Sequence, residues 1–377
     1  MRITAVETYH VAPRWLFVRI GTDTGVEGWG EPVVEGYSRS TETLVHEMGE
    51  LLVGEDPRRV EHLWQALYRG SYYRGGPHIM SAISGIEQAL WDITGKALGV
   101  PVHELFGGAV RDRIRMYAHS MDVTPEGAPA AARAAVARGF DAIKIGVSAP
   151  MSPMPTARVL DAEAARILAV REAVGPDVDV AIDFHGRLLP DAAIALIRRI
   201  EPAELLFIEE PVLPENPAAL LRVQQATGAR LATGERLFTR WGFREVIESQ
   251  AAQILQPDLS HAGGISETRR IAAAAETYYQ LIAPHNPLGP ISLAAGLQIA
   301  ACTPNFLIQE HPTVADRSDL GVGLLTTPFE IEDGHIARPT GPGLGIEVDL
   351  DAVRARALTT HWRTPQLRHP DGSVADW

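Results

Sequence analysis

The segments VAIDFHG (residues 180–186), LLFIEEP (205–211) and LATGERL (231–237) decide the fold of this chain. Each is a short apolar run that ends in acidic side chains, and the residues between two runs have the length and composition of a helix. Strands that alternate with helices at this spacing pair in parallel, with right-handed crossovers. The region therefore predicts three successive β/α units.

The same rhythm continues on both sides of these segments. We expect eight strands, which end near Ala118, Ile145, Asp183, Glu209, Gly234, Pro257, Ala283 and Gln309. Eight parallel strands, each followed by a helix, form a TIM-type (β/α) barrel. An open doubly wound sheet would normally carry a glycine-rich phosphate turn after its first strand, and the sequence has none there. We therefore predict an α/β barrel over residues 113–320, with Asn216, Thr239 and Ser266 as N-caps of three of its helices.

The residues before the barrel have a different pattern. Residues 16–31 predict a β-hairpin, because Leu16, Val18 and Ile20 alternate before the turn Asp23-Thr24-Gly25. Helices are expected over residues 41–53, 58–68 and 78–98, the last with an apolar stripe at spacings of three and four. Residues 1–112 should therefore form an α+β capping domain. The segment 321–377 is only weakly periodic, and we expect it to return to the capping domain.

Composition excludes several classes of protein. The 377 residues include 34 Lys and Arg against 47 Asp and Glu, a net charge of −13, which disfavours binding to nucleic acid or to anionic membranes. Cys302 is the one cysteine, so no intramolecular disulfide can form. The sequence has no signal peptide and no apolar run of about 18 residues, so a cytoplasmic protein is expected.

Polar side chains gather where the predicted strands end. They are Lys144, Asp183, His185, Glu209, Glu235, Asp258, His285 and Glu310. Each of these residues taken alone would more often be a helix cap or a surface ion pair, but consecutive positions are about one β/α unit apart. Because the carboxyl ends of barrel strands meet on one face, we expect these side chains to converge at an active site.

The chemistry of the set favours a divalent metal ion. Asp183, Glu209 and Glu235 offer hard oxygen ligands, which suit Mg²⁺ or Mn²⁺ better than Zn²⁺. Alternation along a strand allows only one of the neighbours Glu209 and Glu210 to face inward, and the sequence does not decide which. His185 should share a face with Asp183, two residues earlier, and stand beside the metal.

A histidine base is expected on the next strands. Asp258 and His285 lie on adjacent predicted strands, where a buried carboxylate that accepts the Nδ1 proton makes the other ring nitrogen more basic. His285 is therefore the candidate base.

Several segments resemble a known family. AISGIEQALWDITGK (82–96) resembles the N-terminal signature of the mandelate racemase branch of the enolase superfamily. Within that branch, the resemblance is strongest to the galactonate dehydratases, and it is carried by DFHGR (183–187), FIEEP (207–211), GER (234–236), QPDLSHAGG (256–264) and APH (283–285). It extends from Met1 to Trp377. It implies a modified, enolase-like barrel and Mg²⁺-dependent dehydration of a sugar acid, D-galactonate first of all, to a 2-dehydro-3-deoxy acid.

The resemblance also implies a role for each site residue. Mg²⁺ would bind Asp183, Glu209 and Glu235, with Glu209 the inward member of its pair. His285, oriented by Asp258, would take the proton from C2, and His185 would protonate the departing 3-hydroxyl. Glu310 would hydrogen-bond the carboxylate as it becomes an enediolate. The expected substrate contacts are Lys144 and, from the capping domain, Arg14, Trp15, Tyr73 and Arg74. The expected partners are a small acid sugar and further copies of the chain.

The chain departs from the family pattern near the barrel mouth. Gly146 stands where an Asn usually follows the strand Lys by two residues, and Asn286 stands where a Cys is familiar. Residues 118–122 and 147–156 also differ. These changes leave the proton chemistry alone and bear on which sugar acid binds.

Two alternatives remain. A racemase or cycloisomerase on the same scaffold usually has a second Lys at the position of Gly146. A catalytically dead sugar-acid sensor would not need both histidines and Glu310, and a single-turnover assay separates it from an enzyme.

Overall fold

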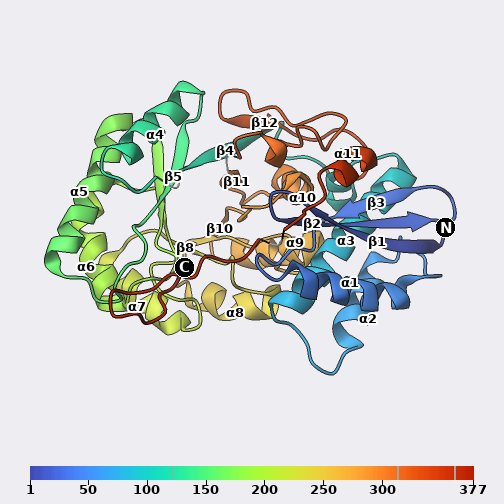
Figure 1. The fold of residues 1–377 in the computed structure, drawn as a ribbon, viewed down its shortest axis with the longest axis horizontal. Helices are drawn as coiled ribbons and strands as arrows, with labels where there is room; N and C mark the ends of the chain where they lie inside the picture. Colours follow the sequence, from blue (N-terminus) through green and yellow to red (C-terminus); the bar gives the residue numbers. More distant parts are fainter. Residues whose placement is uncertain (121, 312–313, 361) are drawn as a thin grey trace.

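The structure, a computed structural model, describes residues 1–120, 122–311, 314–360 and 362–377. The N-terminal part contains an antiparallel sheet of β1 (Ile3–Val11), β2 (Trp15–Thr22) and β3 (Glu27–Gly30). Helices α1 (Ser38–Leu52), α2 (Val60–Arg69) and α3 (Pro77–Leu98) pack beside it (Figure 1). The predicted hairpin is β2–β3. Strand β1 was not predicted, because most of its residues are half-buried and give no clear alternation of apolar and polar side chains.

The rest of the chain forms the predicted α/β barrel. In chain order its elements are β4 (Arg113–Ser120), α4 (Gly127–Ala137), β5 (Ala142–Gly146), α5 (Ala157–Val174), β6 (Asp179–Asp183), α6 (Pro190–Ile200), β7 (Ile208–Glu209), α7 (Pro217–Thr227), β8 (Leu231–Thr233), α8 (Thr239–Ser249), β9 (Ile254–Leu255), α9 (Gly264–Glu276), β10 (Leu281–Ile282), α10 (Pro290–Cys302) and β11 (Gln309–His311). Neighbouring strands pair in parallel from β10 back to β4 and on to β11. Backbone bonds between Ile282 and residues 305–307 close the ring.

Alternation along the strands divides the barrel residues between two cores. The inner core combines small and large side chains: Tyr117, Ala142, Ala181, Phe207, Ala232, Ile254, Ala283 and Ile308. Intervening residues such as Ile143, Ile182 and Ile208 pack outward against the helices. The interior below the site is therefore filled, and residues farther along each strand are held at a fixed height above it.

Carboxylates from the N-terminal part fix it to the barrel. On α3, Glu87 accepts hydrogen bonds from the backbone N–H groups of Ile265 and Ser266 at the start of α9. Glu31, just after β3, accepts from those of Gly289 and Ser292 at the start of α10. Free N–H groups at a helix start carry partial positive charge and favour such partners. The 82–96 segment, which carries the family resemblance, is thus part of the interface between the N-terminal domain and the barrel.

Three N-caps were predicted, and one is observed. The Asn216 side chain accepts from the N–H of Ala219, as expected. Thr239 and Ser266 are not caps: α8 begins at Thr239 without a side-chain cap, and α9 begins two residues before Ser266. Glu87 supplies the acceptor at α9 from another domain, which no local sequence pattern could reveal.

The C-terminal segment crosses the molecule. Strand β12 (His335–Ala337) pairs with β4, and α11 (Leu350–Ala355) follows. Backbone bonds then join Arg356 to Ala12 and Leu358 to His10. The last residues run over the barrel face to end near β8 (Figure 1). Among the described residues, no helix combines the length and the apolar character needed to span a membrane.

Candidate active site

Strand alternation builds a ring of polar side chains above the filled interior. Lys144, Asp183, Glu209, His285 and Glu310 each follow an inward core residue of the same strand or strand end by two positions. A step of two residues returns the side chain to the same face. The barrel therefore brings these predicted residues together.

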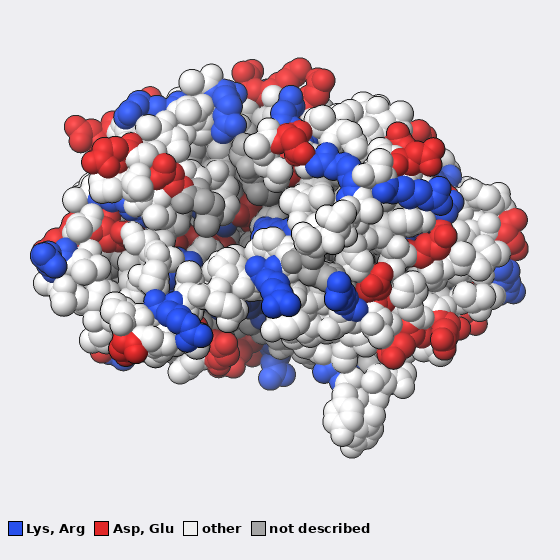
Figure 2. All heavy atoms as spheres, viewed as in Figure 1, with Lys and Arg blue, Asp and Glu red and all other residues white. Residues whose placement is uncertain are grey.

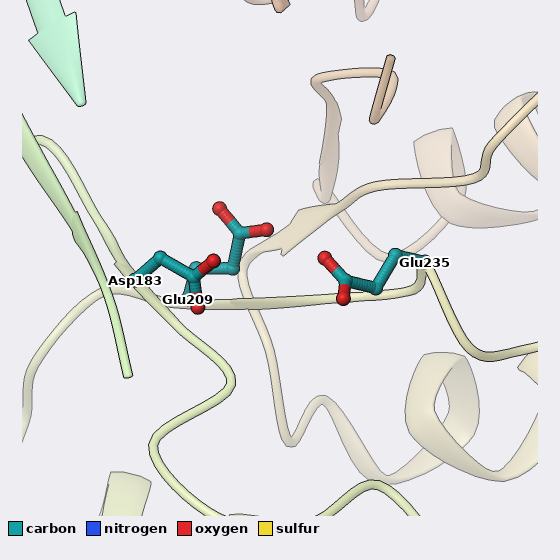
Figure 3. Close-up of side chains that lie close together, drawn as sticks. All are labelled: Asp183, Glu209 and Glu235. Atoms are coloured by element: carbon teal, nitrogen blue, oxygen red, sulfur yellow. The ribbon is translucent and has the colours of Figure 1, made fainter. Parts of the chain in front are cut away.

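Three carboxylates of this ring form one cluster. Ligand atoms of Asp183, Glu209 and Glu235 lie within 4.8 Å of one another (Figure 3). Glu235 reaches the cluster after Gly234, whose φ is +149°. A Cβ on Gly234 would lie 2.8 Å from the backbone of Gln256, so only glycine fits there. Glu209 is the inward member of its pair, and Glu210 instead pairs with Arg236.

The electrostatics of the cluster suit a divalent cation. Oε1 of Glu209 is buried and has no hydrogen-bond partner among the described residues. Burial, and then the nearby carboxylates of Glu210, Glu209 and Asp183, hold the pKa of Glu235 well above its usual value despite the opposing effect of His285. Uncompensated carboxylates at this spacing are unfavourable, and hard oxygen ligands match Mg²⁺ or Mn²⁺. The residues present therefore fit the ion that the sequence predicts.

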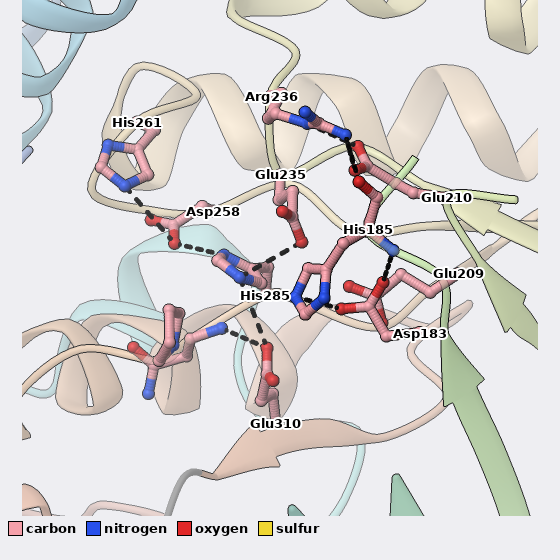
Figure 4. A network of polar contacts seen from close by, with 12 residues as sticks. Asp183, His185, Glu209, Glu210, Glu235, Arg236, Asp258, His261, His285 and Glu310 are labelled. Carbon is pink, nitrogen blue, oxygen red and sulfur yellow. Dashed lines mark hydrogen bonds and ion pairs between the residues drawn. The ribbon is translucent and has the colours of Figure 1, made fainter. Parts of the chain in front are cut away.

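His285 is oriented by Asp258 (Figure 4). Its Nδ1 lies 2.8 Å from Oδ2 of Asp258, which leaves Nε2 facing Glu235 at 3.3 Å. Burial alone would lower the pKa of His285, but the charges of Glu235 and Glu310 and the bond to Asp258 outweigh it and hold that pKa well above 6.5. The free Nε2 of His285 therefore points at the carboxylate cluster, as expected of a base that acts on a substrate bound there.

His185 reaches the cluster by a different route from the one predicted. Strand β6 ends at Asp183, and His185 has φ +50°, so strand alternation does not place its ring. The left-handed backbone instead turns the ring back, with Nε2 2.8 Å from Oδ2 of Asp183. The backbone N–H of His185 also donates to Oδ1 of Asp183 at 2.7 Å. His185 thus lies beside the carboxylate cluster, as expected. Its position comes from a left-handed turn of the backbone, which strand alternation does not predict.

Lys144 connects the carboxylate cluster to Glu310. Its Nζ lies 2.8 Å from both Oε2 of Glu209 and Oε1 of Glu310. The other Glu310 oxygen accepts the backbone N–H of Asn286 at 2.8 Å. Burial raises the pKa of Glu310, but Lys144 and His285 outweigh it and hold that pKa at about 2. An ionised carboxylate only accepts hydrogen bonds, so the predicted bond to a substrate oxygen requires a proton on Glu310.

A cavity of about 410 Å³ lies over the cluster. Its lining includes seven predicted residues: Arg14, Lys144, Asp183, His185, Glu235, His285 and Glu310. Figure 2 shows a hollow between the barrel and the N-terminal domain on the face crossed by the C-terminal segment. Trp377 belongs to the lining, and Arg14 stacks on Trp362 at 5.0 Å. Both ends of the chain thus contribute to the cover of the site.

Three predicted substrate contacts lie elsewhere. Trp15 is 1% exposed and packs in the core with Phe17. Tyr73 is 79% exposed, on the loop between α2 and α3 that projects from the body in Figure 2. Arg74 lies over the ring of Tyr68, 5.9 Å from its centre. None of the three lines the cavity, so their contact with substrate stays a prediction.

Other cavity residues were not predicted. They are Glu35, His119, Arg187, Arg236, His261, Pro287 and Trp377. His119 carries a signal that could have found it, because it ends a predicted strand, as Lys144 does. Glu35 lies in a loop of the N-terminal domain and carries none. Met121, within the divergent 118–122 segment, lies outside the described residues.

Comparison with known proteins gives a consistent result. Residues 2–107 match the mandelate racemase / muconate lactonizing enzyme N-terminal domain, and residues 128–352 match the enolase C-terminal domain-like family. The chain is 48% identical to a D-galactonate dehydratase of Ralstonia nicotianae and 46% identical to one of Variovorax paradoxus, in each case over 100% of both chains.

Solved structures agree. A member of the enolase superfamily from Salmonella Typhimurium has a TM-score of 0.89 at 32% identity, covering 94% of this chain and 97% of that one. An enolase from Agrobacterium radiobacter, solved with bound Na and L-malate, has a TM-score of 0.91 at 32% identity and covers 100% of both chains.

Proposed function

Because this chain belongs to the mandelate racemase branch of the enolase superfamily, we propose that it dehydrates a sugar acid. D-Galactonate is the proposed substrate, since full-length relatives at 46–48% identity carry that name. The products are 2-dehydro-3-deoxy-D-galactonate and water. The observation that carries this proposal is the pairing of an oriented base, His285 on Asp258, with a second histidine, His185, across one carboxylate cluster.

The first step is removal of the C2 proton. Nε2 of His285 takes it, while Asp258 holds the Nδ1 proton and stabilises the imidazolium that forms. The electron pair of the C2–H bond moves toward the carboxylate and gives an enediolate. Lys144 can hold the charged end of the substrate, and Glu310 beside it can donate a hydrogen bond to the same end once it carries a proton.

The second step is loss of the 3-hydroxyl. Hydroxide is a poor leaving group, so His185 donates a proton and the C3–O bond breaks to release water. The electron pair of the enediolate forms the C2–C3 double bond, and the resulting enol gains a proton at C3 and loses the 2-hydroxyl proton to become the 2-keto acid.

Asp183, Glu209 and Glu235 are the residues proposed to hold Mg²⁺. When bound, this ion supplies positive charge that stabilises the enediolate, which would otherwise be too basic for a histidine to generate. Two of these carboxylates contact the histidines: Glu235 lies 3.3 Å from Nε2 of His285, and Asp183 lies 2.8 Å from Nε2 of His185.

We further propose that residues 1–112, 113–320 and 321–377 act as cap, barrel and returning segment. The enzyme would work in the cytoplasm as a homo-oligomer.

The test is a screen of acid sugars with Mg²⁺ for 2-keto-3-deoxy products. D-Galactonate and its C2 to C5 epimers form the central set. Selective formation of keto acid from D-galactonate is expected. Racemisation without dehydration, or no turnover of any sugar acid, would contradict the proposal.

A further inference from the structure

The ring above the barrel interior has a member that the proposed mechanism does not use. His119, near the end of β4, follows the inward-facing Tyr117 by two residues and pairs in register with Lys144 on β5. It also lines the cavity over the metal cluster. Strand β4 thus presents a further histidine to the space shared by His185 and His285.

The imidazole of His119 lacks hydrogen bonds within the described part of the chain. Its side chain is 13% exposed, and Nε2 is shielded from solvent without a partner. Nδ1 lies 3.7 Å from Oε1 of Glu310, too far for a hydrogen bond. Buried polar groups are normally paired, and because Nε2 is closed off from solvent, Nδ1 is the ring nitrogen left for a partner that binds from the cavity.

The ring is suited to a hydroxyl group. Burial, and then the charge of Lys144, lower the pKa of His119 to about 4, so the imidazole is neutral near pH 7. A neutral imidazole donates from one nitrogen and accepts at the other, which matches a hydroxyl. The substrate carboxylate does not need His119, because Lys144 already supplies a cation to bind it.

Gly146 leaves open space at the end of β5, the strand next to the one that carries His119. It pairs with Asp183 in register, and a Cβ at Gly146 would meet no atom of the described residues within 4 Å. Strand β5 therefore ends in open space between the strands that carry His119 and Asp183. A substrate chain longer than three carbons can extend there.

We propose that His119 hydrogen-bonds a hydroxyl of the sugar acid beyond C3 and so helps to select the substrate. This inference rests on the proposed function, in which C1, C2 and the 3-hydroxyl already have partners. The hydroxyls that remain are those at C4, C5 and C6. The contact makes His119 a specificity-determining residue and gives it no part in proton transfer.

The test measures kcat/KM for D-galactonate and its 4-deoxy, 5-deoxy and 6-deoxy analogues. His119→Leu removes both nitrogens at a similar size and should lower kcat/KM for D-galactonate roughly 10- to 100-fold. For one deoxy acid the same change should have little effect, because the hydroxyl that His119 binds is already missing. His119→Gln, which can still donate and accept, should recover part of the loss. His46→Leu, an exposed change on α1, is the matched control and should change nothing.

Two results would overturn the proposal. An equal loss for all four acids would mean that His119 acts only through Glu310 or through folding. No loss for any acid would mean that it makes no contact.

Wild-type turnover tests the proposed function separately. If the wild type converts no sugar acid, that function fails, and calorimetric titration of the same acids with Mg²⁺ tests His119 instead. A loss of affinity for D-galactonate that one deoxy acid does not share supports the proposal, whereas a uniform loss, no loss, or no binding to the wild type contradicts it.

Discussion

Asp258 and His285 are joined by a hydrogen bond of 2.8 Å between Oδ2 and Nδ1, and this bond aims the free Nε2 of His285 at the carboxylate cluster. Asp258 is fully buried, and its Oδ1 is held by the backbone N–H of Ser260. The carboxylate therefore cannot rotate away from the ring. Asp258 therefore sets both the tautomer of His285 and the direction of its free nitrogen.

Replacing His285 by Asn should abolish proton removal. Asp258 holds His285 at 2.8 Å, whereas the other histidine near this carboxylate, His261, lies 3.9 Å away and cannot replace the base, so kcat should fall by more than about 10³-fold. Exchange of the C2 proton with D₂O, followed by NMR, should stop as well. A 3-fluoro analogue should also fail to react, and elimination of fluoride at the wild-type rate would show that His285 is not the base.

Replacing His185 by Asn should separate the two steps. C2-proton exchange should persist, because His285 and Asp258 are intact, while loss of water should fall by about 10²- to 10⁴-fold. Fluoride release from the 3-fluoro analogue should continue, since fluoride needs no proton to leave. If neither exchange nor fluoride release occurred, the assignment of His185 as the acid would be untenable.

Removal of divalent metal should stop the reaction. Exhaustive EDTA treatment is expected to abolish turnover, and Mg²⁺ should restore it, because Asp183, Glu209 and Glu235 converge within 4.8 Å. Glu209→Gln should weaken Mg²⁺ binding measured by calorimetry, whereas Glu50→Gln, on the exposed face of α1, should not. Full activity after EDTA treatment would refute the metal assignment.

Truncation of Glu87 should destabilise the contact between the N-terminal domain and the barrel. Its carboxylate accepts from Trp91 Nε1 and from the N–H groups of Ile265 and Ser266. Glu87→Ala leaves the N–H groups of Ile265 and Ser266 without this acceptor, whereas Trp91 Nε1 keeps Ser266 Oγ, and the change should lower the free energy of unfolding by roughly 2–4 kcal/mol, measured by chemical denaturation. Glu50→Ala should change it by less than about 0.5 kcal/mol. Equal effects would mean that this contact contributes nothing.

Glu31 should make stability depend on pH. Burial raises its pKa to about 8, despite the opposing hydrogen bonds from Ser292 and Gly289, against an ordinary value of 4.5. Between these values the folded chain keeps a proton that the unfolded chain has lost, so this group's contribution to stability falls as pH rises from about 5 to 8. The slope is at most about 1.4 kcal/mol per pH unit.

Glu31→Gln should remove that slope. Unfolding free energies measured from pH 5 to 8 should fall less steeply in the variant than in the wild type, with Glu50→Gln as control. Parallel curves for all three proteins would exclude Glu31 as the cause.

Much of the site could be predicted from the sequence. The barrel follows from the β/α rhythm, and the step of two residues beyond an inward core side chain places Lys144, Asp183, Glu209, His285 and Glu310 on one ring. The same rule places His119, two residues after the inward Tyr117, within the 118–122 segment that departs from the family pattern. Local periodicity sets the face on which a strand side chain lies, so it succeeds wherever the chain is regular.

Only the tertiary structure decided the rest. His185 reaches Asp183 through a left-handed backbone, and Glu235 joins the cluster through Gly234, whose conformation depends on the neighbouring backbone of Gln256. The caps of α9 and α10 come from Glu87 and Glu31, which are about 180 and 260 residues away along the chain. Sequence periodicity describes the regular stretches of a chain. Left-handed turns and contacts between distant segments depend instead on packing across the whole fold, and these complete the site.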